Sequence, residues 1–407
     1  MDKLSVRDIG VSGKKVLVRV DFNVPMDEKT SDIMDDSRIK ASLPTIRYLI
    51  EHRAKVILLS HLGRPNGKVV ESMRMAPVAS RLSQILGQPV KTTGDCIGPE
   101  VEKAANNLTD GQVLLLENLR FHAEEEKGDD AFARALARLG DIYVDDAFGT
   151  AHRAHASITG IARYLPAIAG LLLEKEIATL GGILKEPAHP FTALLGGAKV
   201  SDKVALLKNI MDKVDCLLIG GGMAATFLKA SGKDVGQSQI EADRLTTATS
   251  LMEQVSRSGV SVSLPVDVMV ADKIDAQART EIVSIDNIPK DKKIVDIGPR
   301  TIEIFNKQLD GSKTVFWNGP MGIYEIPQFA EGTRAMANKL ARLKATTVIG
   351  GGSTAEAVAE MGLESKMTFV STGGGASLQF LGGEALPGVE ALLNKGVRVE
   401  KTGVSHK

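Results

Sequence analysis

The stretch KKVLVRV (residues 14–20), ASLPTIRYLIEHR (41–53) and KVILLS (55–60) decides the fold of this chain. The first and third segments are almost continuously apolar, as expected of strands that are covered on both faces. The middle segment has the spacing of an amphipathic helix. Strand, helix and strand in this order predict a parallel α/β unit with a right-handed crossover.

The same alternation continues along the chain. Further strand-like segments are QVLLLEN (112–118), DIYVDD (141–146), FTALLGG (191–197), VDCLLIGG (214–221), VSVSLPVD (260–267), KTVFWNG (313–319), TTVIGGG (346–352) and MTFVSTGGG (367–375). Helical patterns such as APVASRLSQILG (76–87) and DAFARALARLG (130–140) alternate with them. We therefore expect two Rossmann-like α/β domains with parallel sheets, and ligands at the carboxyl edges of the strands.

A long helical pattern near the middle of the chain has no strand before it. It is AIAGLLLEKEIATLGGILKE, residues 167–186, and we expect it to form one helix that joins the two domains, with a cleft between them. This interpretation places an N-terminal domain at residues 1–170 and a C-terminal domain, which includes the connecting helix, at 171–387.

The composition argues against nucleic-acid and membrane partners. In the 407 residues, 50 Lys and Arg balance 50 Asp and Glu, so any anion site has to be a local cluster. The first residues lack the apolar stretch of a signal peptide, and no apolar run approaches the ~18 residues of a membrane span. A cytoplasmic location is the expectation.

The two cysteines suggest neither a disulfide nor a metal site. Cys216 lies in an apolar run and is interpreted as a buried strand residue, whereas Cys96 lies in a polar loop. The histidines form no set with cysteines or carboxylates at the spacing of metal ligands. This usage fits a reducing compartment.

Groups suited to an anion follow the strands of the first half. They are Asp21, Asn23, His61, Arg64, Arg120, His152, Arg153 and His155, with Arg38 at the start of a helix. Arginine binds phosphate or carboxylate bidentately and keeps its charge. The four arginines predict a site for a small, multiply anionic ligand, although each of them could instead be a surface ion-pair partner. We interpret His61 as a ligand contact and His155 as a structural group.

Glycines follow the strands of the second half. They are Gly196, Gly197, Gly220, Gly221, Gly222, Gly319, Gly350, Gly351, Gly352, Gly373, Gly374 and Gly375. Glycine allows close approach to a ligand, and the free N–H groups at a helix start favour phosphate, so this half resembles a nucleotide domain. Two GxGxxA patterns, at 220–225 and 350–355, could mark a dinucleotide site or merely tight turns. No GxxxxGK[ST] motif is present, which excludes an ordinary P-loop NTPase.

Nine motifs occur in the order found in phosphoglycerate kinases. They are RVDFNVP, SHLGRP, ENLRF, DAFGTAHRAHAS, GGAKVSDK, GGGMAATFLK, LPVDVMVADK, WNGPMGIYE and STGGGASL. Essentially the whole chain resembles this family. The resemblance implies a 3-phosphoglycerate site in the N-terminal domain, a nucleotide site in the C-terminal domain, and a tail, about 388–407, that packs back on the N-terminal domain.

The resemblance also assigns individual residues. Those implied to hold 3-phosphoglycerate or 1,3-bisphosphoglycerate are Asp21, Phe22, Asn23, Arg38, His61, Leu62, Gly63, Arg64, Arg120 and Arg153. Those implied to hold ADP or ATP are Gly196, Gly197, Ala198, Lys203, Gly220, Gly221, Gly298, Asn318, Pro320, Glu325, Gly351, Gly352, Ser353 and Thr354. Those implied to surround the transferring group are Arg38, Lys199, Lys203, Gly373, Gly374 and Gly375.

Transfer of a phosphoryl group requires in-line alignment and cancellation of charge rather than a general base. The attacking carboxylate is already ionised at neutral pH, so the histidines need not be catalytic. The resemblance implies Mg²⁺ carried with the nucleotide. We expect a monomer whose domains close about the central helix to exclude water.

Two positions depart from the family. Ser353 stands where the family usually has an Asp that binds the magnesium, and Ala225 stands where Tyr is common. Since Mg²⁺ is often held mainly by phosphates and water, we expect altered magnesium affinity with activity retained.

Two other functions have weaker support in the sequence. A nicotinamide-dependent dehydrogenase would need an acidic residue at the end of the strand after Gly350, but MTFVST ends in Ser371 and Thr372. A binding or regulatory protein that kept the fold but lost catalysis is suggested only by Ser353, and the retained Lys199, Lys203 and Arg38 argue against it.

Overall fold

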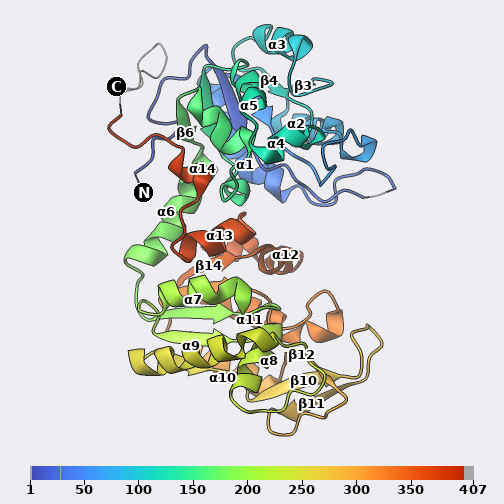
Figure 1. Cartoon of the computed structure of the whole chain (residues 1–407), viewed down its shortest axis with the longest axis vertical. Coiled ribbons are helices and arrows are strands. Elements are labelled where there is room, and N and C mark those ends of the chain that lie inside the picture. The colour runs from blue at the N-terminus through green and yellow to red at the C-terminus, as the bar shows by residue number, and fades with distance from the viewer. Residues whose placement is uncertain (1, 28, 398–407) are drawn as a thin grey trace. The chain divides into compact units, whose positions relative to one another are not determined.

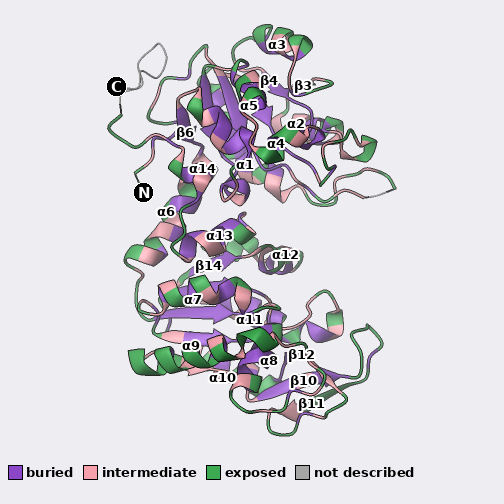
Figure 2. Cartoon of the chain, in the orientation of Figure 1, coloured by how far each residue is buried: buried purple, intermediate pink, exposed green. Residues whose placement is uncertain are grey.

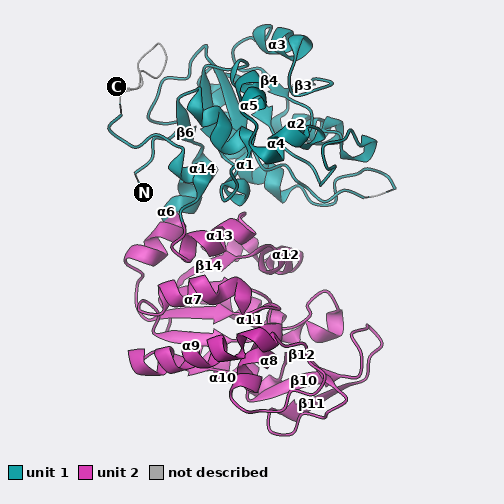
Figure 3. Cartoon of the chain, viewed as in Figure 1, with its two compact units in different colours: residues 1–178, 385–407 teal, residues 179–384 magenta. Residues whose placement is uncertain are grey.

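The computed structural model describes residues 2–27 and 29–397. The chain forms two compact units (Figure 3). Unit 1 takes the described residues up to Ala178 and those from Ala385 onward, and unit 2 is Thr179–Glu384. The division falls inside helix α6 (Leu171–Lys185), so the domain boundary at residue 170 stays a prediction.

Unit 1 is built on a six-stranded parallel sheet in the order β3-β4-β2-β1-β5-β6 (Figure 1). Its strands are β1 (Lys15–Arg19), β2 (Lys55–Leu59), β3 (Val90–Thr92), β4 (Val113–Leu115), β5 (Ile142–Asp145) and β6 (Ala167–Ala169). In the register, Val16 pairs with Val56 on one side and with Ile142 on the other. All carboxyl ends therefore meet at one edge, as the sequence predicts.

Helices cover this sheet. They are α1 (Ser37–Glu51), α2 (Ala76–Leu86), α3 (Pro99–Asn106), α4 (Ala123–Lys127), α5 (Asp130–Ala137) and α14 (Pro387–Glu390), with η1 (Glu71–Met73), η2 (Leu119–Phe121), η3 (Phe148–Thr150), η4 (Ala156–Gly160) and η5 (Ile161–Arg163) as short turns. Ile39 and Ile46 of α1 and Leu82 of α2 pack with Val16 and Val56 in one core. The strands lie among the buried segments of Figure 2.

The prediction of one helix over residues 167–186 is wrong at its start. Residues 167–169 form β6, which pairs with β5 as the edge strand of the sheet, and the helix begins only at Leu171. Asp146, at the end of β5, accepts a hydrogen bond from Leu172 N at 2.9 Å and so caps α6. Gly170 allows this contact, because a Cβ there would lie 2.1 Å from Asp146 Oδ1.

The chain returns to unit 1 after residue 384. Leu4 N donates to Leu393 O at 2.8 Å, Leu393 N donates to Ala167 O at 2.9 Å, and Gly388 N donates to Ala151 O at 2.8 Å. These bonds hold the segment from Gly388 to Leu393 against Ala151, β6 and the start of the chain. The rest of the tail predicted at 388–407, residues 398–407, lies outside the described residues.

Unit 2 contains a second six-stranded parallel sheet, in the order β15-β14-β13-β7-β8-β9. Its strands are β7 (Phe191–Leu195), β8 (Cys216–Ile219), β9 (Ser261–Ser263), β13 (Thr314–Asn318), β14 (Thr346–Gly350) and β15 (Phe369–Val370). The helices are α7 (Val204–Ile210), α8 (Gly221–Ala230), α9 (Leu245–Ser258), α10 (Pro299–Leu309), α11 (Glu331–Leu340), α12 (Gly352–Glu360) and α13 (Gly374–Leu381), with η6 (Ser201–Lys203), η7 (Ala242–Arg244), η8 (Pro327–Phe329) and η9 (Glu364–Lys366). The expected pair of parallel α/β domains is confirmed.

Unit 2 also has an antiparallel sheet that the sequence analysis missed. Its order is β11-β10-β12, with β10 (Asp267–Ala271), β11 (Thr280–Ser284) and β12 (Lys293–Ile297). β11 is exposed or only half-buried along its length, so it lacks the continuous apolar run of a central strand.

No helix among the described residues is long and apolar enough to cross a membrane.

Candidate active site

The loops after β1 and β2 in unit 1 are joined by side-chain hydrogen bonds. Asn23 Oδ1 accepts from Gly63 N at 2.8 Å. Arg38 Nη1, on the first turn of α1, donates to Asp21 Oδ2 at 2.6 Å. Asn23 therefore positions the loop after β2, and Asp21 positions the guanidinium of Arg38.

Phe22 and Leu62 face inward. Both side chains are buried, and Phe22 belongs to the main core of unit 1. The Phe22 amide donates to Ser60 Oγ at 2.9 Å, and the Leu62 amide donates to Asn118 Oδ1 at 3.2 Å. These two residues therefore fix the loops after β1 and β2 from the inside of unit 1.

Four arginines surround His61, which is 4% exposed. Burial lowers the pKa of His61 well below its usual value, and the charges of Arg19, Arg120, Arg38 and Arg153 lower it further. His61 Nδ1 lies 3.1 Å from Arg19 Nη2. Because arginine can only donate, Nδ1 accepts and Nε2 of the neutral ring carries the proton, which it can offer to an anion.

The other predicted arginines differ in how they are held. Arg120 is 4% exposed, donates to Gly63 O at 2.8 Å, and has its Nε 3.2 Å from Glu126 Oε1. Arg153 is half-buried and Arg64 is exposed. Within residues 2–27 and 29–397, neither of these two guanidinium groups has a hydrogen bond or an ion pair.

Sequence reasoning missed a buried polar chain behind His61. Arg19 Nε donates to Ser157 Oγ at 2.9 Å, and Ser157 Oγ donates to Glu125 Oε1 at 2.5 Å. Burial raises the pKa of Glu125, while the charge of Arg19 and the bonds from Ser157 oppose this rise. The available signal was Arg19 itself, a charged residue within the apolar segment KKVLVRV.

The remaining histidines of this region are neutral at pH 7. Burial and the nearby charges of Arg120 and Arg153 lower the pKa of His155 to about 4. His152 has a lowered pKa for the same reasons, burial first and then the charge of Arg153. His155 Nδ1 lies 3.8 Å from Glu125 Oε1 inside the fold, which fits its interpretation as a structural group.

In unit 2, the glycine turns after β7, β8 and β13 pack against one another through their backbones. Gly197 N donates to Pro320 O at 2.8 Å, and Gly221 N donates to Met321 O at 3.0 Å. A Cβ at Gly319 would lie 2.2 Å from Gly196 O, and Gly319 has a φ of +97°. Only glycine allows this approach, which places Gly196, Gly197, Gly221 and Pro320 together at one edge of the sheet.

Two lysines follow β7, and they differ in burial. Lys203 is 6% exposed, and burial lowers its pKa to about 8. No described residue makes a hydrogen bond to Lys203 Nζ. Lys199 and Ala198 are exposed. Glu241, which the sequence analysis did not single out, accepts from Val200 N at 2.5 Å and from Ser201 N at 3.1 Å and so holds the turn that carries both lysines.

The ends of β13 and β14 meet around Asn318. This residue is 2% exposed, and its Nδ2 has no hydrogen-bond partner among the described residues. Gly351 packs against it, since a Cβ there would lie 3.0 Å from Asn318 Nδ2. The Thr354 hydroxyl is buried and accepts from Gly319 N at 2.7 Å. A buried amide donor without a partner indicates a place for a ligand oxygen.

Two helices begin side by side at this edge. A Cβ on Gly374 of α13 would lie 3.2 Å from Gly352 N, the first residue of α12. The N-termini of both helices carry partial positive charge and free amides. Gly352, Ser353, Gly373, Gly374 and Gly375 are thus brought together, with Ser353 exposed.

The last three predicted nucleotide residues lie farther along the same unit. Gly220 N donates to Leu195 O at 2.8 Å, and a Cβ on Gly220 would lie 3.5 Å from Ile297 Cγ2, next to Gly298. Gly298 is the N-cap of α10. Glu325 is exposed in the loop after β13, and no hydrogen bond or ion pair of its side chain appears in the described part of the chain.

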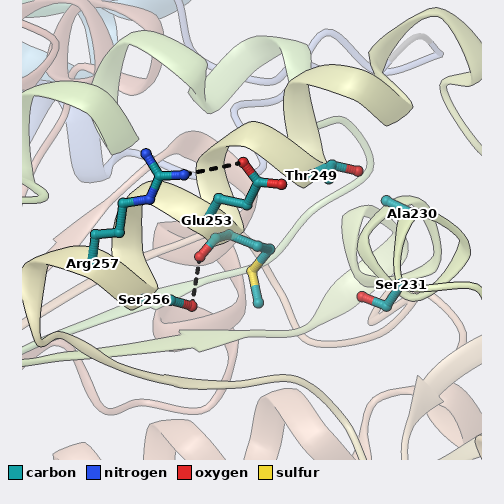
Figure 4. Close-up of a pocket in the computed structure, with 7 residues that line it drawn as sticks. Ala230, Ser231, Thr249, Glu253, Ser256 and Arg257 are labelled. Carbon is teal, nitrogen blue, oxygen red and sulfur yellow. Dashed lines mark hydrogen bonds and ion pairs between the residues drawn. The ribbon is translucent and has the colours of Figure 1, made fainter.

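Two surface grooves lie away from all these residues. One, of 410 Å³, lies between α8 and α9 and is lined by Ala230, Ser231, Thr249, Met252, Glu253, Ser256 and Arg257 (Figure 4). The other, of 550 Å³, is lined by residues from Ser31 to Lys40 and from Pro77 to Gln84. Neither lining includes a predicted site residue, although Asp36 and Lys40 of the second groove flank Arg38 in the sequence.

The interpretation of the cysteines requires correction. Cys96 lies in a loop but is fully buried, whereas Cys216, expected to be buried, is only half-buried in β8. The sequence shows no set of residues at metal-ligand spacing, but the structure brings Asp95, Cys96 and His122 together, with one ligand atom of each within 4.8 Å of the others. Sequence spacing missed this set because 27 positions separate Asp95 from His122.

Comparison with known proteins shows the family of this chain. The family described as phosphoglycerate kinase matches residues 6–384. The phosphoglycerate kinase of Moorella thermoacetica is 53% identical over 97% of this chain and 100% of its own length, and that of Pelotomaculum thermopropionicum is 54% identical over the same shares. The solved phosphoglycerate kinase of Coxiella burnetii superposes with a TM-score of 0.83 at 41% identity, covering 96% of this chain and 98% of that one. The solved phosphoglycerate kinase of Pyrococcus horikoshii gives 0.82 at 34% identity over the same shares. This chain belongs to the phosphoglycerate kinase family.

Proposed function

We propose that this enzyme transfers a phosphoryl group reversibly between 1,3-bisphosphoglycerate and Mg–ADP, forming 3-phosphoglycerate and Mg–ATP. It is a phosphotransferase with a carboxyl group as acceptor, and the reaction serves glycolysis and gluconeogenesis. Membership of the family and relatives that are more than half identical support this assignment.

The main support for a 3-phosphoglycerate site in unit 1 is the cluster of arginines around His61. Arg19, Arg38, Arg120 and Arg153 all act on His61. Among the residues that the structure describes, only Asp21 and Glu126 form an ion pair with any of these four arginines. Collecting like charges in one place is costly unless an anion completes the site. The phosphate and carboxylate of 3-phosphoglycerate would supply that charge, contacting Arg38, Arg64, Arg120, Arg153 and the Nε2 proton of His61.

The glycine turns of unit 2 are proposed to hold the nucleotide. Gly196, Gly197, Gly220, Gly221 and Gly298 would lie against the adenine, and Glu325 against the ribose. The phosphates would contact Lys203, Asn318, Thr354 and the amides of α12. The support is the lowered pKa of the buried Lys203 and the unpartnered Asn318 Nδ2, since an anion would satisfy both groups.

The chemical step needs no general base. A carboxylate oxygen of 3-phosphoglycerate attacks the γ-phosphorus of ATP, the bond from that phosphorus to the bridging oxygen breaks, and ADP leaves with the electron pair. Arg38, Lys199, Lys203 and the amides of Gly373, Gly374 and Gly375 would balance the charge on the equatorial oxygens. The low pKa values of His61 and His155 leave both rings neutral, so neither serves as the acid.

Mg²⁺ is proposed to arrive with the nucleotide, where it would neutralise phosphate charge. The chain contributes little to it at position 353, since Ser353 offers only an exposed hydroxyl at the start of α12. Thr354 already accepts a bond from Gly319 N through its hydroxyl. Mg²⁺ usually keeps several waters and phosphate oxygens as ligands, which is compatible with this sparse set.

Each unit holds one substrate, so transfer requires a closing step that brings the two substrates together and excludes water. We propose that α6, which continues from unit 1 into unit 2, is the element about which this step occurs. The substrates are small anions, and we expect a cytoplasmic monomer with no membrane or nucleic-acid partner.

The test is a coupled assay of ATP consumption with 3-phosphoglycerate across a magnesium series. We expect activity that depends on both 3-phosphoglycerate and magnesium. Folded protein without activity at any magnesium concentration would refute the proposal in favour of a binding or regulatory role. Ser353→Asp would then test whether the missing carboxylate is the cause.

A further inference from the structure

Three potential metal ligands meet in unit 1, outside the residues assigned to the substrates. Asp95 and Cys96 lie in the loop between β3 and α3, and His122 lies between η2 and α4. One ligand atom of each lies within 4.8 Å of the other two. His122 Nε2 is already 2.7 Å from Asp95 Oδ1.

The site has a closed floor and an open side. Cys96 is fully buried, whereas 27% of the His122 side chain and 53% of the Asp95 side chain are exposed. The buried sulfur therefore forms the closed end of the site, and the imidazole and the carboxylate form its exposed side.

We propose that Asp95, Cys96 and His122 bind Zn²⁺ or a divalent cation of similar softness, with water as the fourth ligand. Sulfur, imidazole nitrogen and carboxylate oxygen are the donors that zinc prefers, and magnesium does not. The thiolate and the carboxylate balance the charge of the ion. On binding, the Cys96 thiol releases its proton to solvent, and His122 binds through Nε2 with its proton on Nδ1.

Small movements suffice to admit the ion. Two ligands at about 2.0–2.1 Å from a tetrahedral zinc lie roughly 3.4 Å apart, so the contact between His122 and Asp95 has to widen by about 0.7 Å. Asp95 is the exposed member and lies on a loop, so it can move. The His122 ring packs 5.2 Å from the Phe132 ring, which limits its orientation.

The chain contains a matched control for this site. Asp215, Cys216 and His189 repeat the same residue types, again with Asp directly before Cys, and His189 Nδ1 lies 2.6 Å from Asp215 Oδ2. Cys216 belongs to β8, where consecutive side chains point to opposite faces. In the described residues only the set at Asp95 brings all three ligand atoms together.

Calorimetry with Zn²⁺, in the absence of nucleotide and magnesium, tests the proposal on the full chain. We expect one zinc per chain, and affinity at least tenfold weaker in Cys96→Ser and His122→Gln. Cys216→Ser and His189→Gln should bind as the parent does. Zinc that binds equally to all four variants, or no binding to the parent, would overturn the proposal.

Cobalt provides a second measurement that does not depend on the stability of the Cys96 variant. Co²⁺ bound by the thiolate should give a sulfur-to-metal charge-transfer absorption in the parent and in Cys216→Ser, reduced in His122→Gln. If Cys96→Ser fails to fold, the contrast between His122→Gln and His189→Gln decides. An absorption that is absent from the parent, or lost only in Cys216→Ser, would contradict the site.

Discussion

Both units carry a six-stranded parallel sheet, but one builds its candidate site from side chains and the other from backbone. In unit 1 the site consists of charged side chains, with Arg19, Arg38, Arg120 and Arg153 around His61. In unit 2 it consists mainly of backbone, where the turns at Gly197, Gly221 and Gly319 interlock and two helices begin beside each other.

This difference suits the two ligands. A small acid with charges at both ends is held by guanidinium groups that reach it from several strands. A nucleotide is larger, and amides at helix starts can follow its phosphates closely. It follows that unit 1 should be damaged by removal of side-chain atoms and unit 2 by addition of atoms to glycines.

The largest effect is expected at Arg38. Arg38→Ala removes a positive charge that we propose stabilises the phosphoryl group during transfer. Turnover should therefore fall about a thousandfold. Arg38→Lys keeps the charge but not the planar fork, and it should fall between the parent and the alanine variant. Steady-state kinetics with both substrates measures this effect.

Arg47, exposed on the same helix, is the control. Arg47→Ala should change turnover by no more than about twofold. Equal losses in the two alanine variants, or normal turnover in Arg38→Ala, would refute the role of Arg38.

Gly319→Ala should be the most damaging change in unit 2. The new Cβ would lie 2.2 Å from Gly196 O at a φ of +97°, and we expect about 3 kcal/mol of lost unfolding free energy. Trp317 is buried two residues away, and its Nε1 donates to Gly319 O at 2.8 Å, so its fluorescence in urea reports on unit 2. Gly232→Ala is the control that separates backbone strain from steric clash. Gly232 has a φ of +83°, but a Cβ added there would have no atom within 4 Å. The control should lose only about 1 kcal/mol, and equal losses would show that the packing of the turns is unimportant.

Lys203→Ala tests the buried lysine of the candidate site in unit 2. Loss of a charge-assisted contact should weaken ADP binding by roughly ten- to a hundredfold in calorimetry. Stability should not fall, because burial of the ammonium is unfavourable in the free protein, as its lowered pKa indicates. Lys208→Ala, on the exposed face of α7, should bind ADP normally. Unchanged ADP affinity in Lys203→Ala would remove this residue from the site.

A weaker effect follows from the pKa of Lys203, which is about 8. As pH rises through this value the ammonium loses its proton, so ADP affinity should decline between pH 7 and pH 9, by up to about tenfold. The phosphates of ADP are mostly ionised at pH 7, and any further ionisation would strengthen binding to a cation, so it cannot cause the decline. Lys203→Ala should lack the decline, and a parallel decline in that variant would assign it to another group.

The sequence predicted the features that depend on local pattern. KVILLS and KTVFWNG became β2 and β13, and the groups that follow the parallel strands were brought to one edge because parallel strands share a direction. The residues 167–169 were misassigned because three apolar residues before a helix look helical, and only pairing with β5 makes them a strand.

What remained unpredicted depends on contacts distant in sequence. The chain from Arg19 through Ser157 to Glu125 spans three segments, and no short motif records it. The burial of Cys96 beside His122 is of the same kind. Glu241 supports the turn at Val200 from 41 positions away. Strand β11 was missed for a different reason: it has no buried face, so its sequence lacks the apolar pattern by which a strand is predicted.

The smallest effect is expected at Ser353. This residue would act through its side chain, although the candidate site of unit 2 consists mainly of backbone groups. Ser353→Asp adds a carboxylate that repels bare ADP phosphates but attracts their Mg²⁺ and the N-terminus of α12. The magnesium concentration for half-maximal activity should therefore fall by roughly two- to fivefold, while ADP affinity without magnesium weakens. Ser353→Ala should leave the magnesium requirement unchanged if phosphates and water hold the ion. A magnesium titration that is identical for the parent and Ser353→Asp would show that position 353 does not reach the metal, whereas a large loss in Ser353→Ala would make the hydroxyl itself a ligand.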